Sequence, residues 1–163
     1  MAGVFVQQMH FISNIGDKTF LLPIFGAASV IYVYFLGYKK HAFLLALSGL
    51  AVVFAYFLKL VFKQPRPVTF TSVISIPLDV YSFPSSHTLT YTVFFGYLIF
   101  LFLKLPEIPG ICRIIGVLVS AYFIAFVGVS RVYLGQHYVW DVAAGYVFGT
   151  LYLVGIFLLE KHL

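Results

Sequence analysis

Charged residues are scarce in this sequence. Lys, Arg, Asp and Glu make up 9% of its 163 residues, whereas a soluble domain contains about 25%. Such a chain cannot cover its surface with charged side chains, so the soluble globular class is excluded. The net charge of +5 does not indicate nucleic-acid binding, because the basic residues are scattered over the boundaries of hydrophobic segments instead of clustering.

Cysteine is almost absent as well. Cys112 is the only one, which excludes an intrachain disulfide, and we interpret it as a small buried apolar residue. Residues 1–15 contain neither a basic segment nor a small-residue cleavage site, so no cleavable signal is expected. Phe5, Met9 and Ile12 recur at helical spacing, which favours an interfacial amphipathic helix over a spanning one.

Hydrophobic residues, in contrast, make up 62% of the chain and form long runs. A helix needs about 20 mainly apolar residues to cross a bilayer, and five segments approach this: 20–36, 42–58, 88–103, 114–129 and 139–159. The connections are too short for a further domain. We therefore expect an all-α fold, a polytopic transmembrane bundle of about five spanning helices plus the N-terminal interfacial helix. Residues 1–163 would form one membrane-embedded domain.

The basic residues fall on two sides of the membrane if the spans alternate in direction. One group is Lys39, Lys40, Lys104, Arg113 and Lys161, and the other is Lys18, Lys59, Lys63, Arg66 and Arg131. The counts are equal, but three members of the second group belong to motifs that explain them chemically. Without these three, the excess of positive charge on cytoplasmic loops places the first group and the C-terminus in the cytoplasm. The motifs then face outward.

The longest connection, residues 63–83, lies on the motif side. It contains three prolines and a β-branched stretch, and we interpret it as an interfacial hairpin or a lid. Asp79 within it is either a solvated carboxylate or the partner of a nearby cation.

His137 and Asp141 lie four residues apart at the start of the last hydrophobic segment, so a helix would place them on one face. A carboxylate beside an imidazole fixes its tautomer and prepares the other ring nitrogen for attack on an electrophile. Gly145 and Gly149 continue this face as a small-xxx-small pair, which points it into the bundle. The alternative for the pair is a purely structural hydrogen bond.

The sequence Pro84-Ser85-Ser86-His87 comes directly before an apolar run, which is typical of a helix N-terminus. Such an end presents free N–H groups and a partial positive charge, and both suit a phosphate. Ser85 and Ser86 add hydroxyl donors, and His87 could protonate a leaving oxygen. A helix cap followed by an interfacial histidine is the alternative.

Three cations stand at ends of hydrophobic segments on the same side. They are Lys59, Arg66 between two prolines, and Arg131 after Ser130. Arginine forms bidentate contacts to phosphate oxygens and lysine supplies a point charge, so converging cations suit a phosphoryl transition state. Lys59 could instead be an interfacial lysine that extends to the membrane surface.

No metal ion and no other cofactor is expected. The sequence has no Cys/His cluster, and its acidic residues are too few and too scattered to hold two divalent ions. The cations of the protein would take the place of a metal.

These residues resemble the signature of the type 2 phosphatidic acid phosphatase superfamily. Its first motif, Lys, six residues, Arg-Pro, is similar to Lys59, Arg66 and Pro67; its second, Pro-Ser-Gly-His, to Pro84-Ser85-Ser86-His87. Its third, Ser-Arg, five residues, His, three residues, Asp, is similar to Ser130, Arg131, His137 and Asp141. The resemblance covers residues from about 18 to the C-terminus.

The resemblance implies a role for each motif residue. His137 would be the nucleophile that forms a phosphohistidine, Asp141 would orient it, and His87 would protonate the leaving group and activate water. The phosphate would be held by Lys59, Arg66, Ser85, Ser86 and Arg131. The chain departs from the family in having Ser86 for the usual glycine, and in having about five spans where membrane members usually have six.

The implied function is a metal-independent membrane lipid phosphatase. Its partner would be a phosphorylated membrane lipid, with undecaprenyl diphosphate and lipid A 1-phosphate as leading substrates and phosphatidylglycerol phosphate and phosphatidic acid as alternatives. The implied location is the bacterial inner membrane, with the site facing outward. Two other hypotheses are alternatives to the phosphatase: a lipid-to-lipid phosphotransferase, and a non-catalytic lipid-binding protein. The sequence does not specify an oligomeric state.

Overall fold

The computed structural model describes residues 2–17, 21–67 and 81–163, and these residues form seven helices and no strand. Lys18, Asp79 and most of the connection between residues 63 and 83 lie outside the described part of the chain. In chain order the helices are α1 (Ala2–Asp17), α2 (Leu21–Phe35), α3 (Lys39–Gly49), α4 (Ala51–Phe62), α5 (Ser86–Lys104), α6 (Gly110–Tyr133) and α7 (Val139–His162).

Four helices within the described ranges are long and apolar enough to cross a membrane. α3 and α4 meet at Leu50 and together form one of them, Lys39–Phe62, and the others are α5, α6 and α7. α2 has 15 residues, or about 22 Å at the α-helical rise, which is short for a bilayer core of about 30 Å. The bent pair of α1 and α2 would be a fifth span. The expected all-α transmembrane bundle is confirmed.

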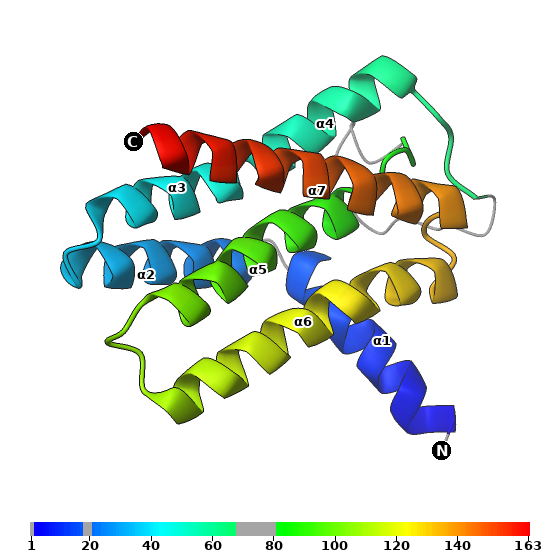
Figure 1. Cartoon of the computed structure of the whole chain (residues 1–163). Helices are drawn as coiled ribbons and strands as arrows, with labels where there is room; N and C mark the ends of the chain where they lie inside the picture. The colour runs from blue at the N-terminus through cyan, green and yellow to red at the C-terminus, as the bar shows by residue number, and fades with distance from the viewer. Residues whose placement is uncertain (1, 18–20, 68–80) are drawn as a thin grey trace.

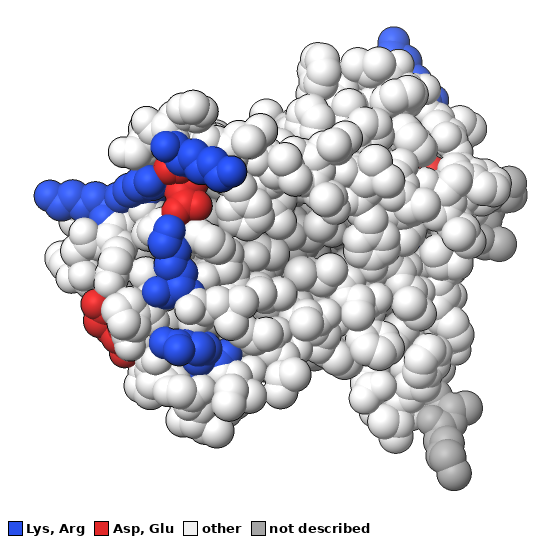
Figure 2. Space-filling model, in the orientation of Figure 1, with Lys and Arg blue, Asp and Glu red and all other residues white. Residues whose placement is uncertain are grey.

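The outer surface of the bundle is apolar, as contact with lipid requires. Large hydrophobic side chains are exposed along α6 and α7, among them Ile111, Leu118, Val147 and Leu151. Figure 2 shows charged side chains gathered mainly at the end where α3 begins and α7 ends. Cys112 is exposed next to Ile111, so its interpretation as a buried residue was wrong, because its position on α6 faces outward.

Helix α5 is the centre of the bundle, with α6 and α7 packed on either side of it (Figure 1). α7 approaches α5 closely because Gly145 and Gly149 lie against Thr88 and Thr92. A Cβ at either glycine would stand 2.8–2.9 Å from a threonine side chain of α5. The small-residue pair therefore has the packing role expected from the sequence, and it fixes the start of α7 beside the start of α5.

Helix α1 packs across α6 near the C-terminal end of α6 (Figure 1). Met9 and Ile12 are buried against the protein, while Phe5 is 40% exposed and contacts the ring of Tyr133. The apolar face of the helix thus covers other helices and not only lipid. Its position at the membrane interface stays a prediction.

Candidate active site

The motif residues meet at one end of the bundle, where α4 and α6 end and α5 and α7 begin. Ser85 is the N-cap of α5, and its hydroxyl oxygen accepts hydrogen bonds from the N–H (3.5 Å) and the hydroxyl (3.0 Å) of Thr88. The backbone N–H of Ser85 donates to the carbonyl oxygen of Asp141 at 3.0 Å. The helix start expected at Ser85 is confirmed, and this bond ties it to α7.

His137 and Asp141 are close together, but not as neighbours on one helical face. α7 begins at Val139, so His137 precedes the helix and Asp141 lies in its first turn. The N–H of Tyr138 donates to Asp141 Oδ2 at 2.9 Å, and His137 Nδ1 lies 3.4 Å from the same oxygen. The expected pairing is present, and the turn that caps α7 produces it, because Asp141 accepts from the N-cap backbone.

Ser82 completes this contact, and the sequence analysis did not identify it. Its fully buried hydroxyl lies 3.2 Å from His137 Nδ1 and donates to Asp141 Oδ2. Its N–H donates to the carbonyl oxygen of Gln64 at 2.7 Å, which fixes the segment before α5. The only sign in the sequence was a serine two residues before Pro84.

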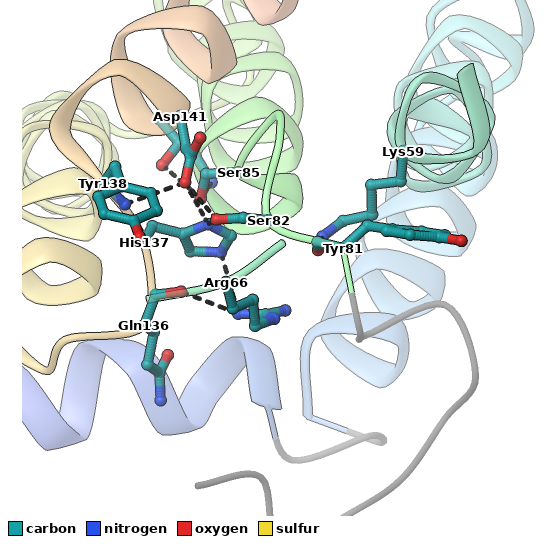
Figure 3. A network of polar contacts seen from close by, with 10 residues as sticks. Lys59, Arg66, Tyr81, Ser82, Ser85, Gln136, His137, Tyr138 and Asp141 are labelled. Carbon is teal, nitrogen blue, oxygen red and sulfur yellow. Dashed lines mark hydrogen bonds and ion pairs between the residues drawn. The ribbon is translucent and has the colours of Figure 1, made fainter. Parts of the chain in front are cut away.

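The surroundings of His137 define its tautomer (Figure 3). Ser82 donates its hydroxyl hydrogen to Asp141, so its oxygen can accept from Nδ1–H of His137. The lone pair is then on Nε2, which lies 3.5 Å from Arg66 Nη1. An imidazole held in this way has a nucleophilic nitrogen directed towards a cation.

Burial lowers the pKa of His137, which is 2% exposed, and the positive charges of Arg131, Arg66 and Lys59 lower it further, while the hydrogen bond to Asp141 opposes them. The His137 imidazole is therefore neutral at physiological pH. The three cations that act on it are the ones that the sequence analysis assigned to phosphate.

Each of the three cations donates a hydrogen bond to an uncharged oxygen of the protein, in addition to its other contacts. Lys59 is fully buried and donates to the carbonyl oxygen of Tyr81 at 2.6 Å. Arg66 Nη1 donates to the carbonyl oxygen of Gln136 at 3.0 Å, and Arg131 Nη1 donates to Ser13 Oγ at 2.6 Å. A fully buried Lys59 does not fit the alternative of an interfacial lysine.

Helix α1 also forms part of the site, although no motif indicated this. Ser13 holds Arg131, and Gly16 lies against His87 so closely that a Cβ there would overlap the imidazole. Tyr91, one turn after His87 on α5, donates its hydroxyl to the carbonyl oxygen of Ile12 at 3.1 Å. The N-terminal helix therefore supports one cation and one histidine of the site.

The remaining two serines of the motifs, Ser86 and Ser130, lie within helices. Ser86 is buried in the first turn of α5, and the Ser130 hydroxyl donates to the carbonyl oxygen of Val127 on its own helix at 2.7 Å. Within the described residues, no group of three or more His, Cys, Asp or Glu side chains is arranged to hold a metal ion.

Comparisons with known proteins identify a family for this chain. The family model described as "PAP2 superfamily" matches residues 37–162. A lipid phosphate phosphatase delta of Arabidopsis thaliana is 35% identical over 74 residues, which are 45% of this chain and 18% of that protein. The chain therefore aligns with about a fifth of the length of this curated relative.

A solved structure is also similar. The crystal structure of the first transmembrane PAP2 type phosphatidylglycerolphosphate phosphatase from Bacillus subtilis matches with a TM-score of 0.72 and 25% identity. The match covers 98% of this chain and 78% of the other. It therefore includes the described helices from α1 to α7.

Proposed function

Because the chain belongs to the PAP2 superfamily, we propose that it is an integral membrane lipid phosphatase that works through a phosphohistidine without a metal ion. The observation that carries the proposal is the setting of His137, whose Nδ1 is held by Ser82 and Asp141 while Nε2 lies 3.5 Å from Arg66. A neutral, oriented imidazole next to a guanidinium is suited to attack a bound phosphate.

In the first half-reaction, the lone pair of His137 Nε2 attacks phosphorus and the bond from phosphorus to the lipid oxygen breaks. Protonated His87 gives its proton to that oxygen, so the lipid leaves as a neutral alcohol or as a lipid phosphate. The imidazole of His137 becomes cationic, and Asp141 stabilises it through Nδ1–H.

In the second half-reaction, neutral His87 takes a proton from a water molecule whose oxygen attacks the phosphohistidine. The N–P bond breaks, its electron pair returns to Nε2, and inorganic phosphate leaves. In both steps the equatorial oxygens carry the charge. We assign them to Lys59, Arg66 and Arg131, together with the N–H groups and hydroxyls of Ser85 and Ser86 at the start of α5.

The substrate class is a phosphorylated membrane lipid. The activity named for the Bacillus subtilis structure favours phosphatidylglycerol phosphate as the first substrate to test, before undecaprenyl diphosphate, lipid A 1-phosphate and phosphatidic acid. The orientation proposed from the charges places the site on the outer side of the membrane, and the location proposed from the family resemblance is a bacterial inner membrane.

The test measures phosphate release from each lipid by purified protein in detergent, with and without EDTA. We expect EDTA-resistant release that is lost in His137→Ala and kept in His162→Ala, a control at the far end of the bundle.

A phosphate label on the protein, stable to base and absent from His137→Ala, would identify the intermediate. EDTA-sensitive release restored by Mg²⁺ would contradict the metal-free mechanism. No release would direct the test to donor and acceptor lipid pairs, and transfer between them would indicate the phosphotransferase.

A further inference from the structure

The N-terminal helix α1 lies outside the part of the chain that the family model matches, which begins at residue 37. It nevertheless contacts the candidate site through Ser13. This residue is 1% exposed, and its hydroxyl oxygen accepts a hydrogen bond from Arg131 Nη1 at 2.6 Å. The contact exists because α1 packs across α6 near the end of α6 that carries Arg131 (Figure 1).

The backbone of Arg131 is joined to the segment that carries the proposed nucleophile. Its carbonyl oxygen accepts hydrogen bonds from the N–H groups of Gln136 at 3.0 Å and of His137 at 3.3 Å. The main chain of Arg131 is therefore fixed beside His137, whereas its long side chain has several rotatable bonds. The place of the guanidinium relative to His137 thus depends on the groups that hold the far end of the side chain, and Ser13 is one of them.

The charge of Arg131 acts on the imidazole of His137. Burial is the main cause of the lowered pKa of His137, and among the three cations Arg131 lowers this pKa the most. A cation so placed can also stabilise the charge of a phosphoryl group that His137 attacks, provided that the guanidinium keeps its position. A displacement of about 1 Å near the reacting atoms can cost about 10²-fold in rate.

Ser13 is suited to hold this cation because its hydroxyl group carries no charge. A carboxylate in its place would offset the charge of the guanidinium and compete with a bound phosphate for it. A hydroxyl oxygen accepts the N–H of Arg131 without offsetting the charge. The acceptor of the Lys59 ammonium group, the carbonyl oxygen of Tyr81, is uncharged as well.

Helix α1 is itself fixed to the bundle at the level of Ser13. Ile12 is fully buried, and its carbonyl oxygen accepts a hydrogen bond from the hydroxyl of Tyr91 on α5 at 3.1 Å. Met9, about one turn earlier on α1, is buried as well. The acceptor for Arg131 therefore stands on a helix that packs on α6 and is bonded to α5.

Resting on the phosphatase function proposed above, we infer that Ser13 is a positioning residue of the reaction, which makes α1 a part of the active site. Ser13 holds the Arg131 guanidinium at the place where the equatorial oxygens of the transferred phosphoryl group carry charge. It acts through Arg131 and needs no contact of its own with the phosphate. The region matched by the family model is then incomplete as a catalytic unit without α1.

The experiment measures phosphate release by the purified full chain in detergent, on the lipid of the panel above that wild type hydrolyses fastest. Ser13→Ala should lower kcat about tenfold, as expected for the loss of a hydrogen bond to a charged group. Its KM should stay within about twofold, because the bond matters most in the transition state. The matched control is Asn14→Ala, an exposed position next to Ser13 on the same helix, which should resemble wild type.

A double-mutant cycle tests whether Ser13 acts through Arg131. Ser13→Ala is introduced into wild type and into Arg131→Met, which has no guanidinium to hold. We expect the loss of about tenfold in the first background and a loss below about twofold in the second. A purely structural contribution of Ser13 would instead lower kcat by the same factor in both backgrounds.

Two results would overturn the inference. One is a kcat of Ser13→Ala equal to that of Asn14→Ala. The other is an equal loss from Ser13→Ala in both backgrounds of the cycle. If Ser13→Ala does not elute as a single species on gel filtration, Ser13→Cys decides in its place, because a thiol is similar in size but a weak acceptor. A wild type that releases no phosphate from any lipid would instead refute the proposed function.

Discussion

The two ends of the bundle both carry charges, but in different ways. At the end where α3 begins and α7 ends, Lys104 pairs with Glu160, and the hydroxyl of Tyr38 donates to the carboxylate of Glu107. The Lys104 side chain is 45% exposed. At the opposite end, Lys59 and Arg131 are buried and donate to a carbonyl and a hydroxyl oxygen.

The difference agrees with a different role for each set of charges. Exposed pairs contribute little to stability, and such cations are suited to interact with water and lipid headgroups and to set orientation. Burying a cation is costly, and this cost supports the proposed role of Lys59 and Arg131 in holding an anion. Each of the four predictions below pairs a substitution in the candidate site with a similar one outside it, so that each tests this contrast.

The largest effect is expected for the two carboxylates. Asp141→Asn should fold but lose about 10⁴-fold in kcat, because the amide no longer stabilises the Nδ1–H tautomer and the cationic imidazole. Glu160→Gln should keep activity within about twofold, because its partner Lys104 is exposed. Phosphate release by purified variants of equal thermal stability measures both. Near-normal turnover of Asp141→Asn would remove Asp141 from the mechanism.

Substitutions of the two arginines at the ends of α6 should differ in their effect on kcat by less than those of the two carboxylates. Arg131→Met should reduce kcat by about 10²–10³-fold, the usual cost of one donor to transition-state charge. Arg113 donates to the carbonyl oxygens of Leu105 and Ile108, so Arg113→Met should cost about 1 kcal/mol of stability and leave kcat unchanged. Turnover and thermal unfolding of both variants are the measurements. Equal turnover would mean that Arg131 is structural.

Ser82 should have a moderate effect as a positioning residue. Ser82→Ala should lower kcat by about 10–100-fold through misorientation of His137, change KM little, and alter the pH dependence of kcat. The control is Ser48→Ala, because Ser48 is also buried but, among the described residues, its hydroxyl donates to the carbonyl oxygen of Leu45 on its own helix and to no other group. Kinetics from pH 5 to 9 would distinguish them, and a pH profile identical to wild type would show that Ser82 only supports the fold.

The smallest effect is a pH dependence of stability. The folded protein lowers the pKa of His137 below its usual value of about 6.5, so the unfolded chain binds more protons just below that pH. Stability should therefore fall as the pH decreases from 6.5, by up to about 1.4 kcal/mol per unit. The decrease should be smaller in His137→Gln but not in His10→Gln, whose residue is exposed on α1. Thermal unfolding at pH 7.5 and 5.5 measures it.

Much of the fold was predictable, because long apolar runs determine transmembrane helices directly. The break at Leu50 and the docking of α1 were not. The bond between Ser13 and Arg131 joins residues 118 positions apart, and no local periodicity encodes such a contact. The site was predictable where its residues stand at fixed spacings at helix ends. Ser82 and Gly16 act only through neighbours that the fold brings to them, so composition and spacing gave no signal for them.

The hydrogen bond from the Ser85 N–H to the Asp141 carbonyl oxygen, with the glycine contacts behind it, has a consequence for protein engineering. It joins the two histidine-bearing segments into one rigid unit made of α5 and α7. A cavity of about 450 Å³ that Ser86 and His87 also line, in contrast, takes its other walls from α1 to α4. A mutagenesis library confined to the cavity-facing positions of α2 and α3 would vary the surroundings of the site while leaving Gly16, His87 and the rest of the reaction machinery intact.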